Sequence, residues 1–246
     1  MKKKIKNVVS SPLYKNDIII VVPTFNNPKT ISNVIKDILK HNYKVIVVDD
    51  GSDTKVSTLI KKDEKITILR HNQNQGKGQA ILTGAKKAKE LGYEYFVSMD
   101  GDGQHLASEI AKLKACINSK NQIVMGARNF EIDNVPKKSK IGRAFHNFWI
   151  RLNSGYHIND SLTGFRLYPV SILDLNIKTR RFNFEVEVLV KHYWKHKNIT
   201  DTIIECYYPT PEERVSHFDN YNDTINITFL HLKLFLQKIF LLKGVF

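Results

Sequence analysis

Two aspartates separated by one glycine are the residues of this chain best suited to chemistry. Asp100 and Asp102 directly follow residues 95–99, an apolar run typical of a buried strand. Side chains two residues apart on an extended backbone point to the same side, so both carboxylates would face one ligand. Paired oxygen donors suit a divalent cation that also holds phosphate oxygens. A polar exit from a strand into a turn is the alternative, because Asp and Gly favour turns.

The elements that must position this pair alternate between strands and helices. Strands are expected at residues 17–22, 44–48, 66–69, 95–99, 123–126 and 203–207. Helices are expected at residues 28–40, 55–61, 79–91, 141–152 and 185–194. Residues 161–166 are expected to form a turn or bulge. This alternation predicts an α/β fold with a mainly parallel sheet and helices on both faces.

Three of the expected strands end in polar residues. Their exits are residues 23–26, 49–52 and 100–102. Ligands of parallel sheets bind beyond the carboxyl ends of the strands. The three exits therefore predict one ligand-binding edge, which favours the phosphate-and-metal interpretation of Asp100 and Asp102.

The composition restricts the partners. Among 246 residues, Lys and Arg number 38 against 24 Asp and Glu, a net charge of +14 that favours an anionic partner. No nucleic-acid-binding module accompanies this charge, so we predict no nucleic-acid partner. Cys116 and Cys206 lack metal-ligand or redox spacing, so no disulfide is expected. The basic start of the chain is not followed by a long apolar segment, so we predict no signal peptide and a cytoplasmic location.

The C-terminal segment is strongly apolar but interrupted by lysines. Lys233, Lys238 and Lys243 argue against a central membrane span and suit an amphipathic helix lying in the membrane interface. A helix docked on the core or on another subunit is the alternative. We therefore expect a basic tail at residues 1–16, one domain at 17–221 and this helix at 222–246.

Five motifs occur in a fixed order along the chain. They are residues 23–26 (PTFN), 49–52 (DDGS), 74–78 (NQGKG), 100–105 (DGDGQH) and 163–166 (TGFR). This set resembles the family 2 glycosyltransferases, and within them the branch of dolichyl- or polyprenyl-phosphate sugar synthases. The resemblance implies a GT-A fold, which is a single Rossmann-like domain that binds a nucleotide-sugar, here a UDP- or GDP-sugar.

The resemblance also implies roles on the donor side. It assigns nucleotide-sugar contacts to Pro23, Thr24, Asn26, Asp50, Lys77 and Asp100. Asp50 would accept a hydrogen bond from the base, or Asp49 or Asp50 would only cap the following segment. Asp100 would lie near the ribose or behind the metal ligands. Asp102 and Gln104 would ligate Mg²⁺ or Mn²⁺, which would hold the diphosphate and stabilise the departing nucleotide. Lys77 would meet phosphate, or remain a solvated lysine before a helix. His105 would be structural or would donate a hydrogen bond to a metal ligand, and would not bind the metal itself.

The acceptor side follows from the same resemblance. Arg128 and Arg143 match positions that grip an acceptor phosphate, and Arg166 would face that phosphate or pair with Asp160. Asp160 is the candidate general base if the acceptor is a hydroxyl, and a positioning group if the acceptor is a phosphate. Asn147 stands where that branch tends to have serine.

Two further matches lie near the end of the domain. Arg214 and His217 resemble a segment that closes over the donor diphosphate.

These inferences predict a metal-dependent, inverting glycosyltransferase that acts on a membrane lipid, either polyprenyl phosphate or a glycolipid hydroxyl. The protein would be peripheral on the cytoplasmic face of the membrane, and its oligomeric state is not predicted. Transfer to a soluble or protein-linked glycan is the alternative within the family. A sugar-phosphate nucleotidyltransferase or a basic nucleic-acid-binding protein are more distant alternatives.

Overall fold

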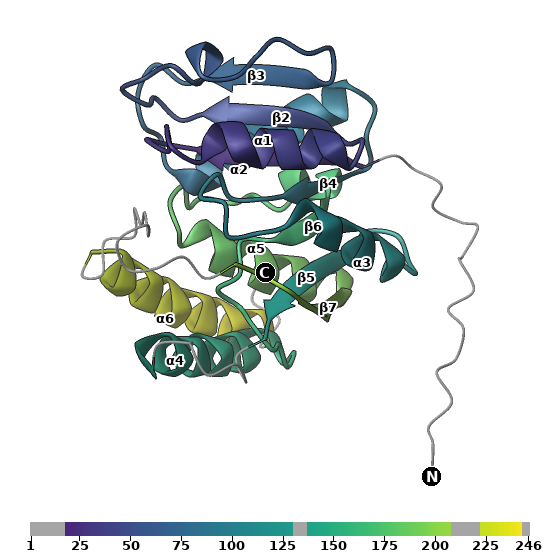
Figure 1. Ribbon diagram of the computed structural model, residues 1–246. Coiled ribbons are helices and arrows are strands. Elements are labelled where there is room, and N and C mark those ends of the chain that lie inside the picture. Colours follow the sequence, from purple (N-terminus) through teal and green to yellow (C-terminus); the bar gives the residue numbers. More distant parts are fainter. Residues whose placement is uncertain (1–17, 130–136, 208–221, 243–246) are drawn as a thin grey trace.

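The computed structural model describes residues 18–129, 137–207 and 222–242 (Figure 1). The strands are β1 (Ile19–Thr24), β2 (Lys44–Asp49), β3 (Ile66–Arg70), β4 (Tyr95–Ser98), β5 (Ile123–Arg128), β6 (Arg166–Pro169) and β7 (Ile199–Ile204). The α-helices are α1 (Ile31–Lys40), α2 (Lys77–Glu90), α3 (Ile110–Ala115), α4 (Lys137–Ser154), α5 (Phe184–His196) and α6 (Asn222–Leu242). Short 3₁₀ turns are η1 (Val56–Thr58), η2 (Ala107–Glu109) and η3 (Val170–Asp174).

All seven strands form one sheet in the order β3-β2-β1-β4-β6-β5-β7. Strands β1 to β4 pair in parallel, and β5 pairs in parallel with β7. Strand β6 is antiparallel to both of its neighbours, β4 and β5. The predicted α/β fold with a mainly parallel sheet is confirmed. The residues that precede β6 therefore reach the same edge of the sheet as the residues that follow the parallel strands.

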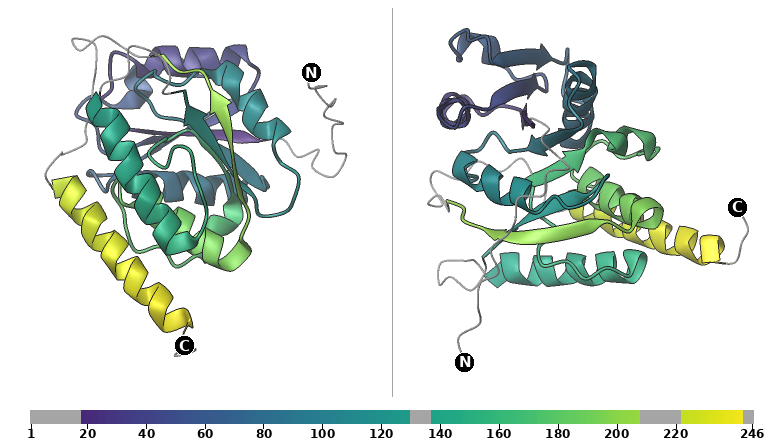
Figure 2. Two further views of the ribbon diagram at one scale, coloured as in Figure 1. Left: turned by 90° about the horizontal axis from the view of Figure 1, so that it is seen from below. Right: turned by 90° about the vertical axis from the view of Figure 1, so that its right-hand side faces the viewer.

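The apolar core has two layers, one on each face of the sheet. Side chains of successive strand residues alternate between them: Ile19 and Val21 belong to the layer beneath α2 and α5, and Ile20 and Val22 to the layer beneath α1 and α3. Helices on both faces explain why these strands are almost continuously apolar. Figure 2 shows the helices on the two faces of the sheet from two further directions.

Most expected elements are present, but α3 was not predicted and α4 begins four residues earlier than expected. Residues 166–169 form a buried strand that was not predicted, directly after the turn expected at residues 161–166. The last strand covers Ile199–Ile204, earlier than predicted, and residues 55–61 contain only η1. The predicted tail at 1–16, with Arg214 and His217, lies outside the described residues.

Helices α4 and α6 pack beside each other outside the sheet (Figures 1 and 2). They carry most of the large apolar side chains that remain exposed: Phe145, Phe148 and Leu152 on α4, and Ile225, Phe229, Leu232, Leu236 and Phe240 on α6. None of the helices within the described residues is long and apolar enough to span a membrane.

Candidate active site

The exits of β1 and β4 pack directly on each other. Thr24, the last residue of β1, pairs in register with Asp49 of β2, and both are buried. A Cβ atom on Gly101 would lie 3.0 Å from the Thr24 hydroxyl oxygen, so only glycine fits there without movement. Thr30 donates a hydrogen bond to the Gly101 carbonyl at 2.6 Å. Pro23 and Thr24 are thus buried strand residues, and Thr24 packs against the loop after β4.

The two aspartates after β2 hold loops in place. Asp49 accepts hydrogen bonds from the amides of Ser52 and Val56 and pairs with Arg70. Asp50 accepts the amides of Gln75 and Gly76 at 2.9 and 2.8 Å. It also lies 2.6 Å from His71 Nδ1. The buried Asp50 carboxylate therefore fixes the loop that leads into α2.

Asn26 lies at the mouth of a small pocket. Its backbone has a positive φ of 51°, a conformation that asparagine tolerates better than most residues. Its side chain exchanges hydrogen bonds with the side chain and amide of Asp53. The pocket beside this pair has a volume of about 240 Å³ and is lined by residues 26–28, 52–54, 56 and 59. The predicted first nucleotide-binding loop thus borders a cavity.

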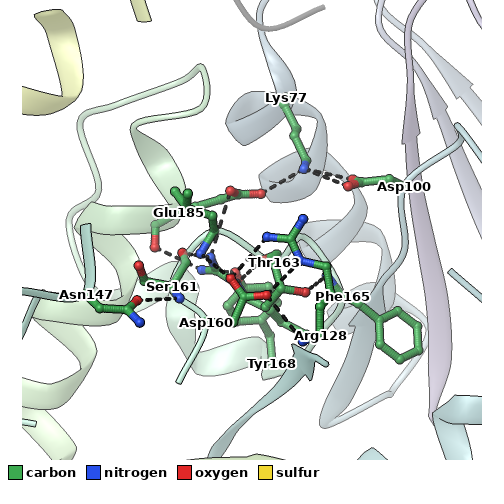
Figure 3. A network of polar contacts seen from close by, with 12 residues as sticks. Lys77, Asp100, Arg128, Asn147, Asp160, Ser161, Thr163, Phe165, Tyr168 and Glu185 are labelled. Carbon is green, nitrogen blue, oxygen red and sulfur yellow. Dashed lines mark hydrogen bonds and ion pairs between the residues drawn. The ribbon is translucent and has the colours of Figure 1, made fainter. Parts of the chain in front are cut away.

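Lys77 lies between two carboxylates, as Figure 3 shows. Its ammonium is 2.8 Å from Asp100 Oδ1 and 2.8 Å from Glu185 Oε1. Burial alone disfavours the charged ammonium, but Asp100 and Glu185 outweigh it and raise the pKa of Lys77 above its usual value. Burial also acts to raise the pKa of Asp100, but Lys77 and His105 lower it, so this carboxylate is ionised. We call the edge of the sheet formed by the exits of β1, β2, β4 and β5 the rim. The rim therefore carries a fixed positive charge beside Asp100.

The Gly164 backbone lies against this ion pair. A Cβ atom there would be 2.7 Å from Lys77 Nζ and 2.9 Å from Asp100 Cγ. The TGFR segment thus closes one side of the site, as expected for a loop that precedes an antiparallel strand at this edge.

Asp102 is the carboxylate best placed for a cation. It makes no ion pair within the described part of the chain, and its Oδ1 accepts the Gln104 amide at 3.0 Å. Burial and the charge of Asp100 raise the pKa of Asp102 to about 6. A bound cation would relieve this repulsion, so the donor set fits a divalent metal. The described residues contain no cluster of three His, Cys, Asp or Glu side chains. A metal here would therefore depend on Asp102, Gln104 and ligand oxygens.

Arg128 and Asp160 form a bidentate pair. Arg128 Nε lies 2.7 Å from Asp160 Oδ2, and its Nη2 lies 3.1 Å from Oδ1. Asp160 is fully buried and also accepts the Leu162 amide. The Asp160 carboxylate orients the guanidinium, which lies at the end of β5 on the same edge as Asp100.

Arg166 occupies a different place from the one predicted. Its side chain is 0% exposed, and it donates hydrogen bonds to the carbonyls of Ser161, Thr163 and Glu185 and to the Tyr168 hydroxyl. It therefore braces the TGFR loop, and it neither pairs with Asp160 nor faces an acceptor. Burial inside the sheet explains the difference, since residue 166 begins a strand.

Helix α4 carries the remaining predicted acceptor residue. Arg143 is half-buried on this helix. Four residues later, Asn147 accepts the Ser161 amide at 3.0 Å and donates to the Asn159 carbonyl at 2.8 Å. Asn147 thus ties α4 to the loop that carries Asp160, a role that serine is too short to fill from the same backbone position.

His105 is buried and stacks on Phe165, with ring centroids 5.0 Å apart and an interplanar angle of 20°. Burial lowers its pKa to about 4, so the ring is neutral near pH 7. This agrees with the predicted structural role.

Glu185 is the site residue that the sequence did not indicate. It lies in the first turn of α5, where a glutamate suits the helix dipole and gives no functional signal.

A sheet of this order, with acidic residues after β4 and an antiparallel β6, defines the class of GT-A folds. The glucosyl-3-phosphoglycerate synthase of Mycobacterium tuberculosis, solved with Mn²⁺ and UDP-glucose, has the same fold. Its TM-score is 0.66 at 14% identity, over 91% of this chain and 79% of that one. Residues 19–175 match the model of glycosyl transferase family 2. The chain belongs to this family and is a glycosyltransferase.

Two relatives act on lipid phosphates according to their names. The UDP-N-acetylglucosamine–dolichyl-phosphate N-acetylglucosaminyltransferase of Methanococcus voltae is 32% identical over 215 residues, 78% of this chain and 86% of the relative. The undecaprenyl-phosphate mannosyltransferase of Micrococcus luteus is 25% identical over 202 residues, 76% of this chain and 82% of the relative.

Proposed function

We propose that this protein is a metal-dependent, inverting glycosyltransferase that moves a sugar from a UDP- or GDP-sugar to polyprenyl phosphate. The observation that carries the proposal is the set of charged side chains on the rim. The carboxylates of Asp100 and Asp102 lie beside the Lys77 ammonium on one edge, and the Arg128 guanidinium lies at the end of β5 on the same edge. Donor and acceptor phosphates are both anionic, and this edge offers a separate cationic feature to each.

On the donor side, Asp102 and Gln104 would hold Mg²⁺ or Mn²⁺. The metal would supply Lewis-acid stabilisation of the departing nucleoside diphosphate. Asp100 would face the ribose, while residues 26–28 and 52–54 would line the place of the base. Asp50 would act by fixing the loop before α2, since its carboxylate already accepts two amides.

On the acceptor side, a phosphate oxygen is already anionic and needs no general base. It would attack the anomeric carbon as the bond to the nucleotide breaks, so the sugar configuration would invert. Arg128 and Arg143 would bind the acceptor phosphate with their planar guanidinium groups. Asp160 would hold Arg128 in place, because its two oxygens already accept that side chain.

The exposed apolar side chains of α4 and α6 support a lipid acceptor. They would place the protein peripherally on a membrane, with the basic residues of both helices toward lipid headgroups. Phe229 is 68% exposed, an unusual position for a phenylalanine facing water. The names of the two relatives point to the same acceptor class.

Purified protein tests the proposal with panels of UDP- and GDP-sugars, Mn²⁺ or Mg²⁺, and vesicles that contain polyprenyl phosphate. We expect release of nucleoside diphosphate and formation of a lipid-linked sugar with inverted configuration. Asp102→Asn should abolish transfer while the circular dichroism spectrum is retained. Asp63→Asn, an exposed aspartate away from the rim, is the matched control. Full turnover in Asp102→Asn, or transfer to soluble glycans alone, would contradict the proposal.

A further inference from the structure

Glu185 is a buried carboxylate that faces the rim from the opposite side to Asp100 (Figure 3). Its side chain is only 9% exposed, whereas that of Asp100 is 23% exposed. Lys77, between them, is 17% exposed. Of the two carboxylates that hold the ammonium, Asp100 is therefore the one that a ligand can reach.

The backbone fixes Glu185 relative to Lys77. The Gln79 amide of α2 donates a hydrogen bond to the Arg180 carbonyl at 2.9 Å. A Cβ atom on Gly78 would lie 2.7 Å from Phe184 Cγ and 2.9 Å from the same carbonyl, so the two segments are in direct contact. The beginnings of α2 and α5 are thus locked together, and the distance between Lys77 and Glu185 is set by the fold.

The two carboxylates that pair with Lys77, those of Asp100 and Glu185, have different roles once a nucleotide binds. Under the proposed function, Asp100 is shared between the Lys77 ammonium and the ribose, so it compensates the ammonium charge less fully. A buried ammonium without a carboxylate partner is costly, so a second and permanent partner is needed. Glu185 meets this requirement because its side chain is the least exposed of the three.

We propose that Glu185 is a positioning residue that holds the Lys77 ammonium beside the diphosphate of the donor. The inference rests on the proposed function, since it requires a nucleoside diphosphate at the rim. Lys77 then contacts the phosphate oxygens and balances the negative charge that grows on the leaving group. Glu185 acts only through Lys77. Arg166, its other charged neighbour at 3.8 Å, keeps its hydrogen bonds to carbonyls and to Tyr168 without the carboxylate.

The test compares binding of nucleoside diphosphates and monophosphates by calorimetry. The full chain in Mn²⁺ is titrated with UDP and UMP, and with GDP and GMP. The measured quantity, for each base, is the dissociation constant of the monophosphate divided by that of the diphosphate. A charge-assisted hydrogen bond to the diphosphate predicts that Glu185→Gln and Lys77→Met each reduce the wild-type ratio by about tenfold or more. In the double variant the ratio should fall no further than in Lys77→Met alone, because both changes remove the same interaction between Lys77 and the diphosphate.

Glu187→Gln is the matched control. Glu187 lies on the same helix and is equally buried, but it binds Lys178, Thr179 and Lys191. It should leave the ratio unchanged, even if its unfolding temperature falls. If the wild-type protein transfers sugar but Glu185→Gln leaves the ratio unchanged, this inference alone is overturned. A wild-type protein that neither binds these nucleotides nor releases nucleoside diphosphate overturns the proposed function as well.

Discussion

Gly164→Ala should reduce activity strongly while leaving stability almost unchanged. The φ angle of Gly164 lies outside the left-handed region, so alanine fits the backbone. The new methyl group would overlap Asp100 Oδ2 most closely and would lie 2.7 Å from Lys77 Nζ. Ordinary contact begins at 3.4 Å, so the carboxylate must be displaced and the ammonium must move by at least 0.7 Å. The obstructing atoms are ends of side chains, which can move. The fold is therefore preserved while the ion pair shifts.

The size of the effect follows from this displacement. Misplacing a reacting group by about 1 Å can cost roughly 100-fold in rate, so we expect kcat/KM to fall by about ten- to a hundredfold. Gly→Ala also restricts the unfolded chain, which stabilises a protein by about 0.4–1 kcal/mol and offsets part of the strain. The unfolding temperature should therefore change little.

Gly78→Ala provides the contrast. There the methyl group meets Phe184 and the Arg180 backbone, which cannot move freely. Overpacking of this kind costs about 1–3 kcal/mol, or roughly 3–10 °C in unfolding temperature for a domain of this size. Initial rates and thermal unfolding of both variants are the assay. Wild-type kcat/KM in Gly164→Ala, or a loss of stability as large as that of Gly78→Ala, would refute the reasoning.

Three further predictions follow from the acceptor side, the buried histidines and the outer helices. Arg128→Lys removes a planar bidentate group, so kcat/KM for the lipid acceptor should fall about tenfold while nucleotide affinity, measured by calorimetry, stays unchanged. Burial lowers the pKa of His231 to about 3 and that of His192 to about 4, below the unfolded value of about 6.5. Below pH of about 6.5 the unfolded chain therefore binds more protons than the folded chain. The contribution of these histidines to stability is complete above pH of about 6.5 and is lost as the pH falls toward about 4. An unfolding temperature that is equal at about pH 5 and about pH 7.5 would contradict this. Phe229→Ser should weaken sedimentation with anionic vesicles, whereas Leu91→Ser, an exposed leucine at the end of α2, should not.

The sequence predicted the first half of the fold well because its strands are continuous apolar runs. The largely apolar runs at residues 18–22, 45–48 and 95–99 stop at Pro23, Asp49 and Asp100, so their carboxyl ends are visible in the sequence. Strand β6 was missed because it has only four residues and begins with an arginine. The guanidinium of that arginine donates hydrogen bonds to the carbonyls of Ser161 and Glu185. The contact with Glu185 depends on the tertiary fold and cannot be read from the local sequence.

The site was predicted in part. The ordered motifs identified the family, which the comparison with known proteins confirms, and the structure brings Lys77, Asp100 and Gly164 into contact. The roles of the individual site residues remain predictions. Glu185 could not be predicted, because its partnership with Lys77 depends on the contact between α2 and α5, and no local pattern encodes it.

The antiparallel insertion of β6 also has a consequence for how the enzyme folds. Leu167 pairs with Val97 and Val124, which precede it by 70 and 43 residues. Loops of this length close slowly, so we expect the β4–β6–β5 pairing to be a late step. Until it forms, no strand links β4, which delivers Asp100, to β5, which delivers Arg128. Under the proposed function, the complete active site is therefore acquired only when β6 has paired with β4 and β5, and we expect a nascent chain that has folded only β1 to β4 to transfer no sugar.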